Sequence, residues 1–231
     1  MDSEFVGEDF LDFKCPHCGA LNSFETSAAK HVRECVNCLD LLLVPAKDGE
    51  AARKLATTVD GPRVRVRALQ ATDWEDLLEF QFEEEDEATG WIPNSGTMRT
   101  SEARGPFFLA VEVRETKKIV GTVGFRFLDV FFDQVEMTLI SNAKANLSGL
   151  ELEALEAALA FCFQEMNLHR VVSQCSAKES ERRKVLSELG MRQEAEFVKH
   201  FLAEGEWLST VWFAMLEEEY LNSQSADLTP S

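Results

Sequence analysis

Two pairs of cysteines near the start of the chain constrain its folding more than any other feature. The pairs are Cys15 with Cys18 and Cys35 with Cys38, and 16 residues lie between them. A C-x2-C turn folds back so that both sulfurs point toward one position, and four thiolates make a closed tetrahedral shell for Zn²⁺. Gly19 suits the positive φ that such a turn often requires. The spacing therefore predicts a structural zinc site that folds the N-terminal segment into a small zinc ribbon.

Other uses of these residues fit the spacing less well. A redox pair would explain one C-x2-C motif, but two motifs at this separation favour a metal. His17 and His31 could also bind a metal, although four cysteines already close the shell, so we expect both at the surface or beside the ligands. The chain starts with acidic residues and shows no secretory signal, which predicts a cytoplasmic protein with metal-binding cysteines rather than disulfides. Cys162 and Cys175 stand in apolar surroundings and are predicted core residues.

The net charge of −18 limits the partners that the chain can take. Phosphate contacts need Lys and Arg, so the charge argues against nucleic-acid binding. In residues 1–45, eight carboxylates outnumber three basic side chains. Solubility is the simplest role for this charge, but it also suits a basic protein or an amine as acceptor. No stretch reaches the ~20 apolar residues of a membrane span, so no membrane is expected. We expect the ribbon to contact a protein partner.

The composition predicts two modules with a polar segment between them. The apolar run Leu39–Val44 is the expected closing strand of the ribbon, which Pro45 ends. The following segment is polar and Ala-rich and closes with Asp-Gly-Pro, which is typical of a linker, with a short helix over Gly49–Leu55 as an option. The last residues are small and polar. The expected division is a zinc ribbon (1–45), a linker (46–62), a larger domain (63–221) and a disordered tail (222–231).

Within the larger domain, the hydrophobic period switches between that of strands and that of helices. The predicted order is β-α-β-β-β-α-β-α-β-β. The strand–helix–strand part implies a parallel crossover and the hairpins imply antiparallel strands, so the sheet is mixed. The predicted strands are Val64–Leu69, Phe107–Arg114, Ile119–Leu128, Val135–Ile140, His169–Cys175, Glu194–Leu202 and Trp207–Leu216, and the predicted helices are 74–82, Gly149–Met166 and Ser180–Leu189.

Five motifs along these elements carry a family resemblance. They are Val64-Arg-Val-Arg-Ala-Leu69, Ile119-Val-Gly-Thr-Val-Gly-Phe125, Asn167-Leu-His-Arg-Val171, Val185-Leu-Ser-Glu-Leu-Gly-Met191 and Gly205-Glu-Trp-Leu208. With them, the chain from about Val64 to Tyr220 resembles the GNAT superfamily of N-acyltransferases, and within it the branch that acetylates ribosomal-protein N-termini and related amines. The resemblance implies a mixed α/β or α+β fold with a centrally splayed sheet flanked by helices. It also implies transfer of acetyl from acetyl-CoA to a protein N-terminus or small amine by direct attack.

The resemblance assigns a site to particular positions. Acetyl-CoA would lie where two parallel strands splay apart, because its pantetheine amides can bond the free backbone groups there. Its diphosphate would lie on the N-terminus of the following helix. Glu136 corresponds to a Glu that faces the acceptor amine and acts as a base, directly or through water, with an outward-facing strand residue as the alternative. The positions that the resemblance assigns to the cofactor are Leu139, Ile140, Ser141, the loop Asn146, Leu147, Ser148, Gly149, Leu150 and Glu151, and Glu179 on the next helix.

The sequence departs from the family pattern in three features: the phosphate loop, the next helix and the general acid. Glu151 stands where the loop normally has a small residue, so its carboxylate would face the diphosphate. Glu179 and Arg182 replace an Asn and a small Ser. The family's Tyr general acid is missing, because the one tyrosine, Tyr220, lies near the expected tail. The alternative is therefore a degenerate, non-catalytic GNAT-fold binding or regulatory protein with the ribbon as its docking module.

Several polar residues keep two roles open. Arg182, Arg183 and Lys184 form a basic triplet that either contacts CoA phosphates or lies on an exposed helix face. Cys175 could in principle protonate a thiolate, although a core position is expected. His200 and Asp133 are weaker candidates for the acceptor site, and His169 is expected to be structural.

Overall fold

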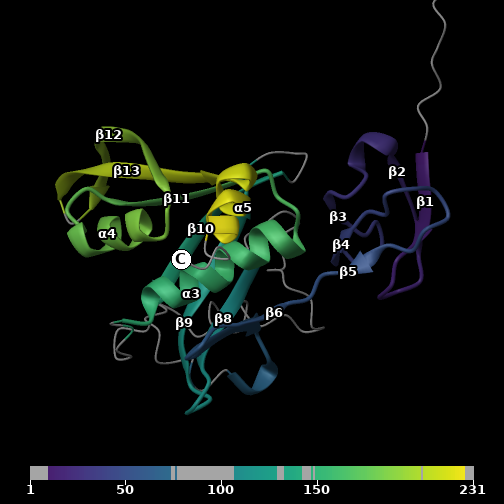
Figure 1. Cartoon of the computed structure of the whole chain (residues 1–231), viewed down its shortest axis with the longest axis horizontal. Helices are drawn as coiled ribbons and strands as arrows, with labels where there is room; N and C mark the ends of the chain where they lie inside the picture. Colours follow the sequence, from purple (N-terminus) through teal and green to yellow (C-terminus); the bar gives the residue numbers. More distant parts are fainter. Residues whose placement is uncertain are drawn as a thin grey trace, which may run out of the picture. The chain divides into compact units, whose positions relative to one another are not determined.

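The computed structural model describes residues 10–73, 76, 107–128, 133–141, 147, 149–203 and 205–226. The chain divides into two compact units, Met1–Leu55 and Ala56–Ser231, hereafter the first and second units (Figure 1). Among the described helices, none has the length and apolar character that a bilayer crossing requires.

The first unit is built from two hairpins, and each carries one cysteine pair in its turn. β1 (Phe10–Lys14) pairs antiparallel with β2 (Leu21–Glu25). After the 3-10 turn η1 (Thr26–Ala28), β3 (Val32–Glu34) pairs antiparallel with β4 (Leu41–Leu43), and β4 pairs with β5 (Arg53–Lys54). The hairpins share a small apolar core made of Leu11, Phe13, Ala28, Leu42, Val44 and Ala52, together with Cys15 and Cys35.

The two cysteine turns have the same backbone geometry. The Gly19 N–H donates to the Cys15 carbonyl at 3.0 Å, and the Leu39 N–H donates to the Cys35 carbonyl at 3.0 Å. Both donors have positive φ, 75° for Gly19 and 61° for Leu39. Glycine tolerates this region, whereas a side chain at Cβ is strained there. The second turn therefore holds an exposed leucine in a conformation that suits glycine.

The segment predicted as a linker contains two short strands. Arg53–Lys54 forms β5 of the first unit, and Thr58–Asp60 forms β6, which belongs to the sheet of the second unit. The short helix expected over Gly49–Leu55 is wrong, because this segment contains turns and strand β5. The boundary lies at Leu55 rather than at Pro45, since pairing with β4 brings Ala52 and Leu55 into buried positions.

The second unit contains a mixed sheet, as the sequence predicts, with eight strands among the described residues rather than the predicted seven. Its strand order is β12-β13-β11-β10-β9-β8-β7-β6, and β10 with β11 is the one parallel pair among the described strands. All seven strands predicted from the sequence are present. The bounds are β6 (Thr58–Asp60), β7 (Val64–Ala68), β8 (Phe107–Val113), β9 (Ile119–Phe127), β10 (Gln134–Ser141), β11 (Arg170–Ser176), β12 (Arg192–Ala203) and β13 (Glu206–Leu216).

Helices cover one face of this sheet. α3 (Glu151–Ala160) contacts β7 and β6 and continues as a π-helical turn, η3 (Phe161–Glu165), while α4 (Ser180–Glu188) lies beside β11 (Figure 1). Phe161 packs on the rings of Phe107 and Phe125 at 6.3 and 5.6 Å between centroids, so η3 closes the core. The helix predicted over 74–82 falls outside the described residues, apart from Asp76.

The C-terminal segment is more ordered than its composition suggests. α5 (Glu217–Ala226) includes Asn222–Ala226, so the expected disordered tail is wrong for these five residues, and 227–231 lie outside the described part. Tyr220 is 5% exposed and its ring stacks on Phe163 at 4.9 Å. The Gln164 amide donates to its hydroxyl at 2.8 Å. This aromatic anchor holds the helix against η3, which polar composition alone does not reveal.

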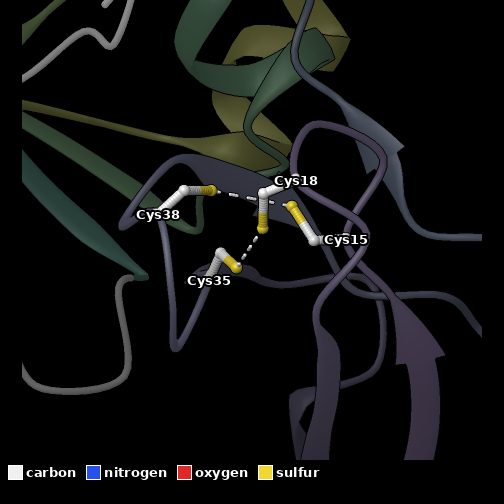
Figure 2. A group of neighbouring side chains, drawn as sticks. All are labelled: Cys15, Cys18, Cys35 and Cys38. Carbon is white, nitrogen blue, oxygen red and sulfur yellow. Dashed lines mark hydrogen bonds between the residues drawn. The ribbon is translucent and has the colours of Figure 1, made fainter.

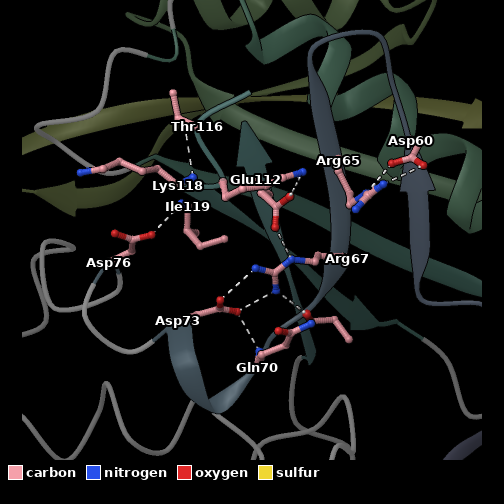
Figure 3. Close-up of polar contacts among 12 residues, drawn as sticks. Asp60, Arg65, Arg67, Gln70, Asp73, Asp76, Glu112, Thr116, Lys118 and Ile119 are labelled. Atoms are coloured by element: carbon pink, nitrogen blue, oxygen red, sulfur yellow. Dashed lines mark hydrogen bonds and ion pairs between the residues drawn. The ribbon is translucent and has the colours of Figure 1, made fainter. Parts of the chain in front are cut away.

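A buried ion network fixes the first strands of the second unit (Figure 3). Arg67 on β7 donates to both carboxylate oxygens of Asp73 at 2.8 and 2.9 Å and to Glu112 on β8 at 2.7 Å. Asp73 belongs to the 3-10 turn η2 (Ala71–Asp73) and also accepts the Gln70 N–H at 2.7 Å. The hydrogen bond to Asp73 raises the pKa of Arg67 above its usual range, so the guanidinium stays charged. Bidentate pairing of this kind fixes geometry as well as adding energy.

A second carboxylate joins the start of β7 to α3. Glu153 is 8% exposed and accepts the Val64 N–H at 2.8 Å, the Arg63 N–H, and the Arg63 guanidinium at 3.0 Å. Burial alone would raise the pKa of Glu153, but these donors outweigh it and hold the pKa below its ordinary value of 4.5. Glu153 therefore stabilises the fold in its charged form.

Leu39→Gly should stabilise the first unit by about 0.5–1 kcal/mol, because it removes left-handed strain from an exposed leucine. Gly19→Ala is the matched control and should destabilise by a similar amount, since a Cβ there meets no atom within 4 Å and only strain changes. Thermal unfolding in zinc-containing buffer, followed by NMR amide signals of β1–β4, measures both. A loss of stability in Leu39→Gly would show that the leucine's contacts outweigh its strain.

Glu153→Gln should lower the free energy of unfolding of the second unit by about 2 kcal/mol at pH 7, because hydrogen bonds to a charged group are lost. A carboxyl with a lowered folded pKa stabilises above its unfolded pKa, and the effect disappears as the pH falls through the folded pKa. The difference between wild type and variant should therefore shrink below pH 4.5. Urea unfolding followed by tryptophan fluorescence measures it, since all four tryptophans lie after residue 55.

The control for that experiment is Glu156→Gln on the same helix. Burial, and then the Glu153 charge, raises the pKa of Glu156, so its charged form is disfavoured and its removal should cost no stability at pH 7. An equal loss in both variants, or a loss in Glu153→Gln that persists unchanged at pH 3, would contradict the assigned role.

Candidate functional site

The four cysteines predicted as metal ligands meet at one point of the first unit (Figure 2). Their sulfurs all lie within 4.8 Å of one another, with Cys15 Sγ 3.8 Å from Cys38 Sγ and Cys18 Sγ 3.6 Å from Cys35 Sγ. A tetrahedral site with metal–sulfur bonds of about 2.3 Å has sulfur–sulfur edges of about 3.8 Å. The cluster therefore has the dimensions of a four-thiolate metal site.

Backbone and amide donors point at these sulfurs. The His17 N–H lies 3.4 Å from Cys15 Sγ and the Asn37 N–H 3.5 Å from Cys35 Sγ. Asn22 is 1% exposed; its amide contacts Cys35 Sγ at 3.7 Å and its carbonyl accepts the Val36 N–H at 2.9 Å. A side chain from β2 thus ties one cysteine turn to the other, and donors of this kind orient metal ligands.

The thiols of the cluster do not ionise alike. Burial would raise the pKa of Cys35, but backbone N–H donors and the Asn22 amide lower it to about 6. Burial, joined by the neighbouring thiols, raises the pKa of Cys38. Four thiolates at this separation repel one another unless a cation lies among them. The cluster could therefore hold a metal ion. His17 instead pairs with Asp40 at 3.3 Å, beside the ligands, as expected.

In the second unit, the strands β10 and β11 diverge at the predicted position. Their parallel pairing covers three residue pairs and ends at Glu136 opposite Val172. β10 then continues to Ser141 along β9, and β11 continues to Ser176 along β13. Ser173 donates to the Met137 carbonyl at 2.9 Å where the gap begins. Beyond it, the edge of β10 through Leu139 and Ile140 has no backbone partner in β11, which suits the amides of a pantetheine chain.

Glu136 lies at the base of this gap and is 7% exposed. Its Oε2 accepts the Arg126 guanidinium, with Nε at 3.0 Å, and its Oε1 accepts the Gln174 amide. A carboxylate has about four lone-pair sites, so Oε1 keeps one acceptor position beyond these three bonds. The side chain is neither free in solvent nor saturated, and its role as a base stays a prediction.

At the far end of the gap lies a cavity of about 430 Å³, hereafter the donor cleft. It is lined by the end of β10 and the first turns of α3 and α4: Leu139, Glu151, Lys178, Glu179, Ser180, Glu181 and Arg182. Glu151 does not turn into solvent; its carboxylate pairs with the Arg182 guanidinium. The Arg182 side chain is only 12% exposed, so an exposed helix face is wrong for this member of the basic triplet. Lys184 does lie on such a face, 68% exposed.

The rest of the predicted phosphate loop is described in part. Leu147 is buried, and Gly149 has a φ of 77°, with its carbonyl accepting the Arg63 guanidinium. Asn146 and Ser148, and the side chain of Ser141, lie outside the described residues. Glu179 turns back and accepts the Ser176 N–H at 2.7 Å. The strand half of the site thus offers unpaired backbone groups along β10, whereas the helix half presents carboxylates to the cleft.

Four other residues that the sequence singled out do not line the donor cleft. Tyr220 on α5 is buried against Phe163, so it cannot serve as a general acid in the donor cleft. Cys175 is 7% exposed, and burial raises its pKa, in agreement with a core role. His200 is exposed and its Nδ1 lies 3.1 Å from Thr210 Oγ1, beside a cavity of about 390 Å³ that Gln174 also lines. The backbone of His169 donates to the Asp133 carbonyl at 2.9 Å and accepts the Glu217 N–H at 3.0 Å, and a structural role for its side chain stays a prediction.

Sequence reasoning missed the partners of both acidic residues. Arg126 and Gln174 hold Glu136, and Arg182 holds Glu151. The alternation of β9 and β10 puts Arg126 opposite Glu136, so the strand register contained this signal. Residues 151 and 182 are far apart in sequence, and no local pattern links them.

Comparison with known proteins agrees with this architecture. A family model for the acetyltransferase (GNAT) domain matches residues 63–192. The uncharacterized N-acetyltransferase YnaD of Bacillus subtilis is 27% identical over 173 residues, 68% of this chain and 96% of that protein. The uncharacterized N-acetyltransferase p20 of Bacillus licheniformis is 23% identical over 111 residues, 48% of this chain and 62% of that protein.

Solved structures share the fold. A GNAT-family acetyltransferase from Bacillus anthracis has a TM-score of 0.59 at 24% identity, covering 70% of this chain and 99% of that one. The spermidine/spermine N-acetyltransferase SpeG of Vibrio cholerae has a TM-score of 0.58 at 18% identity, covering 70% and 96%. A putative ribosomal-protein-serine acetyltransferase of Vibrio cholerae has a TM-score of 0.52 at 20% identity, covering 69% and 97%. The family model spans more than half of the residues of this chain. This chain therefore belongs to the GNAT family of acetyltransferases.

Proposed function

We propose that this chain transfers an acetyl group from acetyl-CoA to an amine, either a protein N-terminus or a small amine. The observation that carries the proposal is the divergence of β10 and β11 directly after Glu136. It leaves a strand edge that can bond a pantetheine arm and ends beside a buried carboxylate. Family membership together with this gap favours the enzyme over a non-catalytic GNAT-fold binding protein.

The residues at the gap have distinct tasks in this proposal. A bound acetyl-CoA would supply an activated acetyl group: the amine nitrogen would bond to the acetyl carbon, the carbon–sulfur bond would break, and the CoA thiol would leave. Glu136 accepts an N–H of the amine at its remaining position on Oε1 and takes the proton, directly or through water. Arg126 and Gln174 hold the carboxylate so that this position faces the gap, and such positioning lowers the entropic cost of reaction.

The acidic charge of the chain favours a cationic amine as the acceptor. A chain with a net charge of −18 attracts cationic amines and repels anions at long range. Two structural neighbours act, by their names, on spermidine or spermine and on a ribosomal-protein serine. The acceptor panel should therefore contain polyamines and also peptides with Ala or Ser at the N-terminus, the latter for the ribosomal-protein branch that the motifs resemble.

Release of the CoA thiol from acetyl-CoA in the presence of this panel tests the proposal. Glu136→Gln should lower kcat by about 10²-fold or more, because the amide keeps the size of the side chain but cannot take a proton. Glu218→Gln, an exposed carboxylate on α5, is the matched control and should keep wild-type turnover. Absence of any binding to millimolar acetyl-CoA in calorimetry, or wild-type turnover in Glu136→Gln, would overturn the respective part of the proposal.

We also propose that the metal of the cysteine cluster is zinc and that the first unit is a protein-docking module. Four thiolates at tetrahedral spacing suit Zn²⁺ and leave no coordination position open for catalysis. Exposed apolar side chains lie within and just after the cysteine turns: Leu21 at 66%, Val36 at 65% and Leu39 at 44%. Such side chains, on an acidic module, suit contact with a protein rather than with nucleic acid.

Removal of the metal should unfold the first unit alone. Binding energy at a structural zinc site is folding energy, and each unit has its own core. With excess chelator, the NMR amide signals of residues 10–55 should collapse to the unfolded range, while tryptophan fluorescence of the second unit stays unchanged. Cys18→Ser should mimic the chelator, and Cys162→Ser should not. Retention of the first-unit signals after complete zinc removal would contradict the proposal.

A further inference from the structure

Two of the departures from the family pattern in the donor cleft contact each other. Glu151 begins α3 and Arg182 lies in the first turn of α4, and their side chains form an ion pair. The Arg182 side chain is 12% exposed and that of Glu151 is 30% exposed. The pair is therefore largely removed from water. Solvent and salt screen a partly buried ion pair less than one at the surface.

This pair supplies an anion at the start of a helix. The first N–H groups of α3 have no partners within the helix, and the helix dipole favours negative charge there. Leu150, at the N-cap, makes no side-chain capping bond. The Glu151 carboxylate is thus an anion that the chain itself places at this position, and Arg182 is its counter-ion.

The other described charges around the cleft do not offset it. Glu179 and Glu181 also line the cavity, and Lys178 donates to Glu206 at 2.6 Å. The lining then holds three carboxylates against two basic side chains. A diphosphate that enters the cleft therefore meets a net negative wall, and both basic side chains of that wall are already paired with carboxylates.

We propose that Glu151 is an internal stand-in for the diphosphate of the acyl donor, and that the two anions compete for Arg182. The inference rests on the proposed function. The donor is then held chiefly by its pantetheine arm along β10, and its nucleotide end adds little affinity while Arg182 stays paired with Glu151. Glu151 thus sets how strongly this chain distinguishes CoA thioesters from shorter pantetheine thioesters.

Paired titrations with CoA and with pantetheine, followed by NMR of the full zinc-loaded chain, test this directly. Glu151→Gln removes the competing charge but keeps the side-chain size, so it should bind CoA at least about tenfold more tightly than wild type does. That factor corresponds to about 1.4 kcal/mol. Affinity for pantetheine, which has no diphosphate, should change less than about twofold. The ratio of the two affinities is the readout, and it does not depend on turnover.

Glu181→Gln is the matched control, because it removes the same charge from the same cavity without touching Arg182. It should raise CoA affinity by less than a third of the effect of Glu151→Gln. An equal effect of the two variants would mean that the net charge of the cavity alone sets CoA affinity, and it would overturn the proposal. An unchanged CoA-to-pantetheine ratio in Glu151→Gln would overturn it as well.

Arg182→Gln provides the second arm. In the Glu151→Gln background it should abolish the gain in CoA affinity, because the residue for which the anions compete is gone; a gain that survives overturns the proposal. Thermal midpoints of all variants verify folding. The proposed function is judged separately: if wild type transfers acetyl groups and Glu151→Gln leaves CoA binding unchanged, the function stands and this inference fails. If wild type neither binds CoA nor transfers acetyl groups but Glu151→Gln binds CoA, this inference stands alone.

Discussion

The parallel contact between β10 and β11 is only three residue pairs long, and the second unit is organised around its end. A longer pairing would satisfy the backbone of Thr138–Ser141 and close the gap. A shorter one would separate the two halves of the sheet, because this contact is what joins the strands from β6 to β10 with those from β11 to β13. The strands diverge while each keeps its antiparallel neighbour, so the gap costs few backbone hydrogen bonds. Glu136 and both cavities beside the gap take their positions from this divergence.

The starts of α3 and α4 meet at the open end of the gap, and here the chain differs from its family pattern in a coordinated way. A carboxylate on one helix and a guanidinium on the other would each be unfavourable alone, because an isolated charge with little access to water is costly. Together they form a pair that holds the two helices at the mouth of the cleft. The same pair gives a charged partner to the glutamate at the position that the resemblance assigns to a diphosphate.

The first unit follows a different physical rule. A segment of this length buries too little apolar surface to fold alone, and small modules of this kind depend on a metal or on disulfides. Its few core side chains pack around the cysteine sulfurs, and Asn22 and the backbone N–H groups orient those sulfurs. The strain at Leu39 is tolerated because the second cysteine turn repeats the geometry of the first, where glycine occupies the same position.

Much of this structure could be predicted from the sequence, because its signals are local. The cysteine spacing determined the meeting of four sulfurs, since each C-x2-C turn aims two of them, and hydrophobic periodicity determined the strands and the helices α3 and α4. Polar composition misled at residues 46–62 and 222–226, where β5, β6 and α5 form through pairing and through the burial of Tyr220. The partners of Glu136 and Glu151 were decided only by tertiary structure. Arg126 and Gln174 reach Glu136 through sheet register, and Arg182 reaches Glu151 through the packing of two helices whose first turns lie 31 residues apart in the chain. Ion pairs at such separation leave no periodic trace, because nothing between the two residues has to repeat.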